Sequence, residues 1–211
     1  MAQTKLIKVD SLNPQEHLIK EAADTIRSGG LVVIPTETVY GIAANMLDKK
    51  AVERLYEVKQ RPRTKPFALL IDRKDRIEDF AMRIPVLAYK LADKFWPGPL
   101  TIILKSKDNN GGIGLRMPDN EIALRIIAES AVPIVCPSAN LSGKEAPVNM
   151  ESALRDLNGL VELAVDGGTA EIGMESTIID LTRAPYVLLR EGAVKKEEIE
   201  GLARKKTILF V

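Results

Sequence analysis

Histidine and cysteine are almost absent from this 211-residue chain, which has one of each, His17 and Cys136. A zinc site of the usual kind needs three or four such ligands, so these two side chains cannot build one. A Ser-His-Asp triad would have to use His17, which falls on a predicted amphipathic helix. A single cysteine also rules out an internal disulfide and is typical of a reducing compartment. The composition therefore argues against hydrolase chemistry and against a zinc site of the usual His/Cys type, and we expect no metal ligand from the protein.

Long apolar runs and an excess of one charge are also lacking. No apolar stretch approaches the ~20 residues that a membrane span needs, and the N-terminus has no signal-peptide core. Lys and Arg number 30 against 29 Asp and Glu, and this net charge of +1 argues against a dedicated nucleic-acid binder. The hydrophobic fraction of 45% suffices for a substantial core. We expect a soluble, cytoplasmic protein with no membrane partner, built on one main domain.

Helical and strand patterns occur throughout the chain and predict an α/β fold. Apolar residues recur at helical spacing or form short runs of strand length. The predicted helices cover residues 14–28, 48–59, 85–95, 121–129, 150–157 and 195–204. The predicted strands cover residues 31–34, 67–71, 100–104, 113–116, 134–136, 160–165, 177–181, 187–189 and 207–210. Because these elements do not alternate in strict βαβ order, we expect a mixed, twisted sheet with flanking helices.

Two polar motifs carry the chemistry. Four cations fall within the seven residues Lys59-Gln60-Arg61-Pro62-Arg63-Thr64-Lys65, and Ser138-Ala139-Asn140 forms a polar turn after an apolar run. Cations bind polyphosphate oxygens through charge-assisted hydrogen bonds. Taken alone, the cluster also fits a solvated helix end that complements the helix dipole. No G-x-x-x-x-G-K-[ST] loop occurs, so a nucleotide would have to be held by side chains.

The two motifs resemble those of the YrdC-like family of L-threonylcarbamoyl-adenylate synthases, whose signature is K-x-R followed later by S-x-N. Lys59 and Arg61 match the first half, and the turn at 138–140 matches the second. Further blocks follow in the family's order, at residues 35–41, 96–101, 114–118, 176–180 and 189–192. The resemblance covers roughly residues 14–195. It implies an open sheet with a concave, positively charged face, in a single domain over residues 1–211 without the second C-terminal domain of some relatives.

The resemblance also implies a reaction. Threonine's amine takes up bicarbonate, and the resulting N-carboxylate attacks the α-phosphate of ATP to give threonylcarbamoyl-AMP and pyrophosphate. Mg²⁺ accompanies the ATP. Other proteins then transfer the threonylcarbamoyl group to the tRNA adenosine beside the anticodon, with at most weak tRNA contact by this chain. No protein nucleophile is needed, because catalysis rests on positioning and on cations that stabilise phosphate charge.

The same resemblance assigns roles to nine residues. Lys59 and Arg61 are the expected catalytic pair. The expected nucleotide contacts are Lys59, Arg61, Lys65, Ser138, Asn140 and Arg190. The expected threonine contacts are Thr38, Arg116 and Ser176, with the Arg116 guanidinium as partner of the threonine carboxylate. Structural roles are the alternative for single residues, since Thr38 also suits a strand end, Ser176 a turn cap and Arg190 a surface ion pair.

Two positions depart from the family's pattern. Leu70 stands where many members have a histidine that lines the threonine pocket. Leucine cannot hydrogen-bond, so we expect an altered pocket or a dispensable contact. Cys136 stands where a threonine or similar small residue often faces the substrate, and it fits a small buried hydrophobe.

Two other functions remain open. One is the carbamoyl-adenylate-forming module of hydrogenase-maturation proteins, which normally lies in a longer chain with zinc-finger-like segments. The other is an RNA-binding protein that makes no adenylate. The related YciO branch, whose function is unassigned, departs from the S-x-N motif. The intact Ser138-Ala139-Asn140 favours the synthase.

Overall fold

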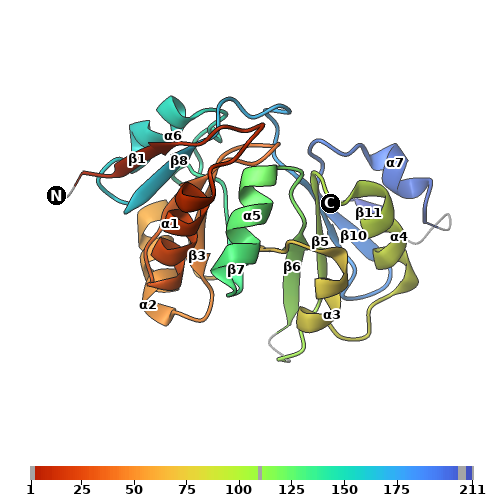
Figure 1. The fold of residues 1–211 in the computed structure, drawn as a ribbon. Coiled ribbons are helices and arrows are strands. Elements are labelled where there is room, and N and C mark those ends of the chain that lie inside the picture. The colour runs from red at the N-terminus through yellow and green to blue at the C-terminus, as the bar shows by residue number, and fades with distance from the viewer. Residues whose placement is uncertain (1–2, 109–110, 204–207, 211) are drawn as a thin grey trace.

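The computed structural model describes residues 3–108, 111–203 and 208–210, and these form one mixed sheet with helices on both faces (Figure 1). The sheet has 11 strands among the described residues, in the order β1-β8-β2-β3-β7-β4-β6-β5-β9-β10-β11. The strands are β1 Lys5–Lys8, β2 Val32–Ile34, β3 Gly41–Asn45, β4 Leu69–Leu70, β5 Leu100–Lys105, β6 Gly112–Arg116, β7 Ile134–Val135, β8 Leu163–Asp166, β9 Thr177–Asp180, β10 Tyr186–Arg190 and β11 Ile208–Phe210. The helices are α1 Glu16–Arg27, α2 Lys49–Lys59, the short 3₁₀ helix η1 Lys74–Arg76, α3 Ile77–Phe80, α4 Val86–Phe95, α5 Glu121–Ser130, α6 Met150–Leu157 and α7 Lys196–Glu200.

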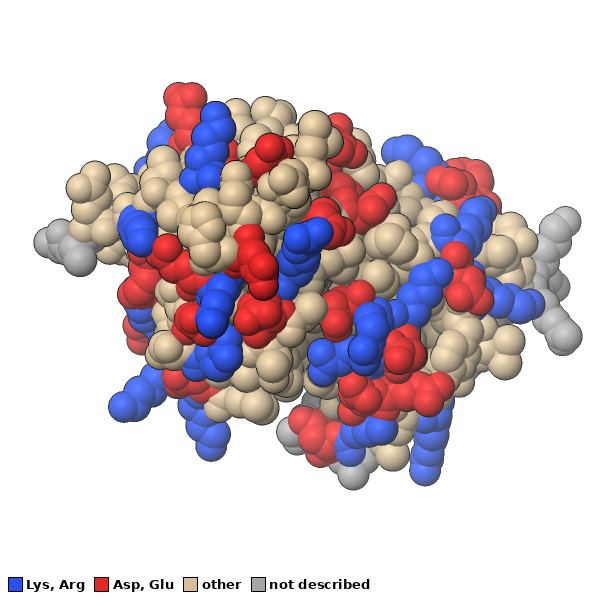
Figure 2. Space-filling model, viewed as in Figure 1, with Lys and Arg blue, Asp and Glu red and all other residues tan. Residues whose placement is uncertain are grey.

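Neighbouring strands run both parallel and antiparallel, which confirms the predicted mixed sheet. Strand β2 pairs antiparallel with β3 and parallel with β8, while β5 pairs antiparallel with β6 and parallel with β9. The described strands do not close into a barrel, since β1 and β11 form the two edges. On the face shown in Figure 2, basic and acidic side chains are interspersed over all the elements. The positive charge of a concave face therefore stays a prediction.

The sheet is narrowest at its centre, where β4 and β7 have only two residues each. The two strands pair antiparallel, with Leu69 opposite Val135, so β7 ends where β4 begins. Gly41 lies against the segment that follows β7. A Cβ at this glycine would lie 2.4 Å from Cys136 Sγ, so only glycine allows the two segments to approach so closely. This close approach holds the S-x-N turn beside the narrow centre of the sheet.

Apolar side chains cover both faces of the sheet. Helices α1 and α5 pack side by side on one face (Figure 1), where Ile26 and Ile126 join Ile34 of β2 in one buried cluster. Val33, the neighbour of Ile34, points to the opposite face and packs in a second cluster with Leu55 of α2. Strand β2 is therefore apolar on both sides, as its continuous apolar run predicted. No helix in this described part of the chain has the length and apolarity that a membrane crossing requires.

Most predicted elements are present with shifted ends. Asp48 caps α2 as expected, because its carboxylate accepts hydrogen bonds from the backbone N–H groups of Lys50 and Ala51 at 2.9 and 3.2 Å. Strands β1 and β3 and the short helices η1 and α3 were not predicted. The predicted helix at 195–204 is the shorter α7, and Arg204 and Thr207 lie outside the described residues.

Candidate active site

A pocket of about 170 Å³ opens beside the two central strands, β4 and β7. The described residues that line it include three arginines and one glutamate, so its charged lining is positive. Five predicted site residues are among them, from five separate segments of the chain. The lining comprises Val39, Arg61, Pro66, Phe67, Ala68, Leu70, Thr101, Ile103, Gly112, Gly114, Arg116, Cys136, Pro137, Ser138, Glu175, Ser176, Ile178 and Arg190.

The last residue of α2, Lys59, joins the two sequence motifs. Its side chain is only 1% exposed, and its ammonium group donates to the carbonyl oxygens of Ser138 and, at 2.7 Å, Asn140. The backbone N–H of Ser142 also donates a hydrogen bond to the Lys59 carbonyl oxygen, at 2.9 Å. Burial, and next the charge of Arg61, lower the pKa of Lys59 to about 8. Lys59 therefore holds the S-x-N turn against the helix end, as a largely protonated side chain at neutral pH.

Arg61 projects into the pocket from a loop that it also braces. Gln60, the residue that follows α2, has the left-handed conformation (φ 50°) that ends the helix. The guanidinium of Arg61 donates to the carbonyl oxygens of Lys65 at 2.9 Å and Pro66 at 3.2 Å, and lies 5.2 Å from the centre of the Phe67 ring. Burial lowers the pKa of Arg61. The side chain of Lys65 itself is exposed and is not part of the pocket lining.

A buried ion pair fixes Arg116 at the end of β6. Its Nη2 donates to Glu37 Oε2 at 2.7 Å and to the hydroxyl of Thr38 at 2.8 Å, and its Nε donates to the Gly98 carbonyl at 3.3 Å. Glu37 is 4% exposed, and its other oxygen, Oε1, has no hydrogen-bond partner among the described residues. Thr38 is fully buried, so it supports Arg116 and does not line the pocket. The predictions missed Glu37, although it directly precedes Thr38 in the quoted 35–41 block.

Ser176 and Arg190 are in contact in the lining of the pocket. Arg190 donates from Nε to the Ser176 carbonyl at 2.9 Å and from Nη2 to the Ser176 hydroxyl at 3.3 Å. Its Nη1 forms an ion pair with Glu175 at 2.8 Å. The Ser176 hydroxyl lies 2.9 Å from that of Thr101. The expected threonine contact and the expected nucleotide contact are thus direct neighbours, and Glu175 and Thr101 are pocket residues that the predictions missed.

The two residues that depart from the family's pattern both line the pocket. Leu70 is buried and gives that wall an apolar surface. Cys136 is partly exposed but packs against the apolar cluster that contains Ile26 and Ile126, so the expected small buried hydrophobe is confirmed only in part. Burial raises the pKa of its thiol to about 12, an effect that the charge of Arg116 opposes. The thiol is therefore protonated at neutral pH and makes a soft, uncharged wall.

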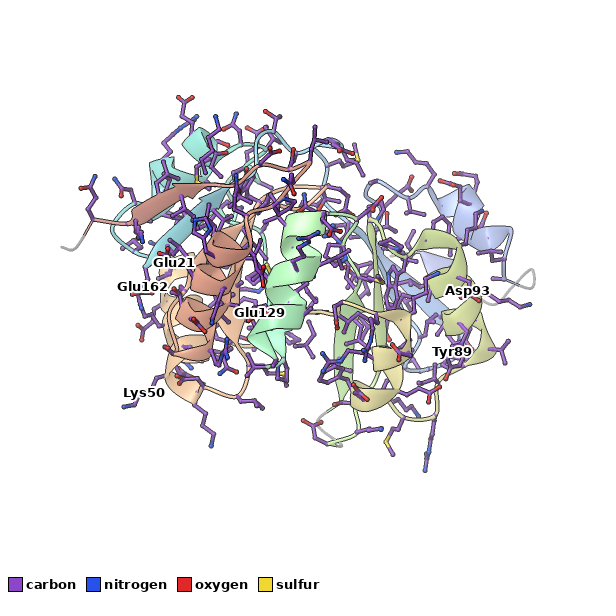
Figure 3. The ribbon with its side chains drawn as sticks, viewed as in Figure 1. Glu21, Lys50, Tyr89, Asp93, Glu129 and Glu162 are labelled. Carbon is purple, nitrogen blue, oxygen red and sulfur yellow. The ribbon has the colours of Figure 1, made fainter. Side chains whose placement is uncertain are left out.

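A larger hollow of about 680 Å³ lies beside α1, and its acidic groups already have partners. Figure 3 shows Glu21 and Glu162 near one another there. Glu162 forms an ion pair with Arg54 at 2.7 Å, and Glu21 forms one with Lys5 at 2.5 Å. No group of three or more His, Cys, Asp or Glu side chains in the described ranges is placed to hold a metal ion. The pocket beside β4 and β7 is therefore the better candidate site.

Comparisons with known proteins agree on one family. The Sua5/YciO/YrdC family model, described as "Telomere recombination", matches residues 24–192. A threonylcarbamoyl-AMP synthase of Pyrococcus abyssi is 46% identical over 194 residues, which cover 88% of this chain and 57% of that protein. A threonylcarbamoyl-AMP synthase of Bacillus subtilis is 41% identical over 202 residues, covering 92% and 58%. The chain thus spans little more than half the length of these two relatives.

Two solved structures share the fold. The crystal structure of P. abyssi Sua5 complexed with L-threonine superposes with a TM-score of 0.92 at 43% identity, covering 98% of this chain and 63% of that one. The crystal structure of E. coli YciO superposes with a TM-score of 0.80 at 30% identity, covering 92% and 98%. The predicted family and the predicted open α/β architecture are both confirmed.

Proposed function

This chain belongs to the Sua5/YciO/YrdC family, and we propose that it makes threonylcarbamoyl-AMP and pyrophosphate from L-threonine, bicarbonate and ATP. One observation carries the proposal. Lys59 joins the K-x-R and S-x-N motifs beside a pocket that gathers Arg61, Arg116 and Arg190. Three guanidinium groups in one pocket suit a ligand with several anionic groups, because each guanidinium can bind a carboxylate or phosphate through paired hydrogen bonds.

The size of the pocket supports a division between the two substrates. Its volume of about 170 Å³ is below the ~300–1,000 Å³ that is usual for small-molecule sites. We assign the enclosed part, between Arg116 and Ser176, to threonine. The nucleotide then extends outward past Arg61 and Arg190, with Lys65 on the exposed loop as an outer contact. Ser138 and Asn140 orient it from the turn that Lys59 holds.

The reaction needs no nucleophile from the protein. The threonine amine attacks bicarbonate, water leaves, and an N-carboxylate forms. An oxygen of this carboxylate attacks the α-phosphorus of ATP, the bond to the β-phosphate breaks, and pyrophosphate departs with the charge. Arg61 and Arg190 stabilise the charge that develops on the phosphates, and Arg116 fixes the threonine carboxylate. Mg²⁺ enters as the complex with ATP.

The product is an activated threonylcarbamoyl group, which must be passed on to an acceptor. We infer that other proteins, in the cytoplasm, transfer this group to the tRNA adenosine beside the anticodon. The near-neutral composition, with a net charge of +1, supports at most weak tRNA contact by this chain.

The test is a reconstitution with the whole chain, magnesium, ATP, bicarbonate and isotope-labelled threonine. We expect pyrophosphate release and a labelled acyl-adenylate, both lost when either threonine or bicarbonate is omitted. Release of inorganic phosphate, or a need for carbamoyl phosphate, would instead indicate a carbamoyl-adenylate-forming module. Tight RNA binding with no nucleotide turnover would indicate an RNA-binding protein.

A further inference from the structure

One acidic side chain, Glu175, lies among the cations of the pocket. It lines the pocket with Arg61 and Arg190, and its carboxylate pairs with Arg190 Nη1 at 2.8 Å. Its negative charge also acts on the other cations, because it raises the pKa of Lys59 and of Arg61 against the lowering effect of burial. The carboxylate of Glu175 thus lies where an anionic ligand is expected to bind, and its role there needs an explanation.

The backbone of Glu175 is fixed while its side chain is free to turn. The Glu175 carbonyl accepts a hydrogen bond from the Ala193 N–H at 3.1 Å. A Cβ at Gly192 would lie 2.1 Å from the same carbonyl oxygen, so this tight approach requires glycine. The side chain of Glu175 is 41% exposed. Its carboxylate can therefore leave Arg190 by rotation of its own side chain, without movement of the chain around it.

Arg190 has separate anchors that remain when Glu175 leaves. Its Nε and Nη2 donate to Ser176, at 2.9 and 3.3 Å, while Nη1 pairs with the Glu175 carboxylate. The guanidinium therefore keeps its orientation, and Nη1 becomes available to a ligand. We propose that Glu175 is a displaceable counter-anion, which occupies Arg190 in the free protein and yields it to the phosphate groups of the nucleotide.

The energetics of the pair fit displacement. Both side chains are more than a third exposed, at 35% and 41%, and exposed pairs are weak because water and salt screen them. A pyrophosphate group carries more charge and more acceptor oxygens than one carboxylate, so it competes effectively for the guanidinium. The same competition opposes retention of pyrophosphate after the reaction, since Glu175 can pair again with Arg190 as the product departs. This second consequence rests on the proposed function.

The test compares Glu175→Gln with Glu191→Gln in binding of pyrophosphate, measured by calorimetry on the whole chain at two salt concentrations. Glu191 is the matched control, because it is adjacent to Arg190 and 45% exposed but lies 3.9 Å from Lys195 instead. We expect Glu175→Gln to bind pyrophosphate about 1.5- to fivefold more tightly, the range of one displaced surface ion pair. Glu191→Gln should bind like the unaltered chain. Unchanged or weaker binding by Glu175→Gln, with its unfolding midpoint intact, would overturn the proposal, and weaker binding would show that Glu175 positions Arg190.

A second measurement separates this proposal from the proposed function. During turnover, Glu175→Gln should be inhibited by added pyrophosphate at about 1.5- to fivefold lower concentration than the unaltered chain. If polyphosphates bind as expected but no adenylate forms, the proposed synthase activity is wrong and the counter-anion role stands. If adenylate forms and pyrophosphate affects both chains alike, the counter-anion role is wrong. If the unaltered chain and Glu175→Gln both fail to bind any polyphosphate, both proposals are wrong.

Discussion

The ammonium nitrogen of Lys59 lies 2.7 Å from the carbonyl oxygen of Asn140, a residue 81 positions further along the chain. The contact uses a side chain from K-x-R and a backbone group from S-x-N, so neither motif forms its part of the site alone. Lys59 has a structural duty as well as a charge, because it satisfies two buried carbonyl groups of the turn. A substitution here therefore changes both the free energy of unfolding and the binding of anions.

The first prediction concerns the pH dependence of stability through Lys59. Its pKa is about 8 in the folded protein, below its ordinary value of 10.5. Between these values the unfolded chain binds more protons than the folded one, so the contribution of Lys59 to stability rises with pH. Relative to Lys59→Met, the unaltered chain should gain about 2 kcal/mol in free energy of unfolding between pH 8 and pH 10.5.

Urea unfolding of both proteins across this range checks the prediction. Lys59→Met cannot titrate at this position, so the difference between the two curves removes the effects of other lysines and tyrosines. A difference that stays constant with pH would mean that burial does not lower the pKa of Lys59.

The second prediction separates a defined site from a diffuse basic patch. Arg61 lines the pocket, whereas Arg63 is exposed and pairs with Glu53 on α2. Arg61→Ala should lower kcat/KM. The decrease should correspond to a loss of about 2–4 kcal/mol of transition-state stabilisation, the scale of one lost electrostatic donor. Arg63→Ala should change kcat/KM much less, because water and salt screen its exposed charge. Steady-state kinetics with ATP varied measures both, and equal losses would mean that the cations act together as a surface field.

Much of the fold could be predicted because apolar runs and helix caps are local signals. The run Leu31–Ile34 and the cap at Asp48 both led to the observed elements. Strand β3 was not predicted because its sequence, Gly41-Ile42-Ala43-Ala44-Asn45, has a single β-branched residue and no alternation of apolar and polar residues. Its strand character comes from pairing with β2 and β7, which only the assembled sheet supplies. Edge strand β1 is four residues long, too short for a clear pattern.

The site was predicted where a motif identified a residue, and was missed where a role depends on distant contacts. Arg61, Ser138 and Arg190 were expected at one place and lie in one pocket. The partner of Arg116 is Glu37, 79 residues away, and no spacing rule relates the two. Glu175 was overlooked because an acid in a phosphate site runs against the charge argument that identified the cations. The individual ligand contacts remain predictions.

The third prediction concerns the buried pair of Glu37 and Arg116. Both side chains are less than a tenth exposed, so removal of one leaves a buried charge without its partner. Glu37→Ala should lower the free energy of unfolding by about 3–5 kcal/mol. Glu121→Ala is the control, because its pair with Arg125 on α5 is about half exposed, and it should cost at most about 0.5 kcal/mol. Denaturant unfolding compares the two, and equal costs would show that the Glu37 pair is screened like a surface one.

The last prediction divides the two substrates between Arg116 and Arg190. Arg116 is held by Glu37 and Thr38 at the enclosed end of the pocket, and we expect its planar fork to grip the threonine carboxylate. Arg116→Lys keeps the charge but loses the fork, so it should raise the KM for threonine about tenfold and leave the KM for ATP nearly unchanged. Arg190→Ala should instead raise the KM for ATP, since we assign Arg190, together with Arg61, to the nucleotide. Both KM values are measured for each variant, under conditions where binding equilibrates before chemistry. If both variants shift both constants alike, the two arginines stabilise a shared transition state or the shape of the pocket, and the assignment of one arginine to each substrate is wrong.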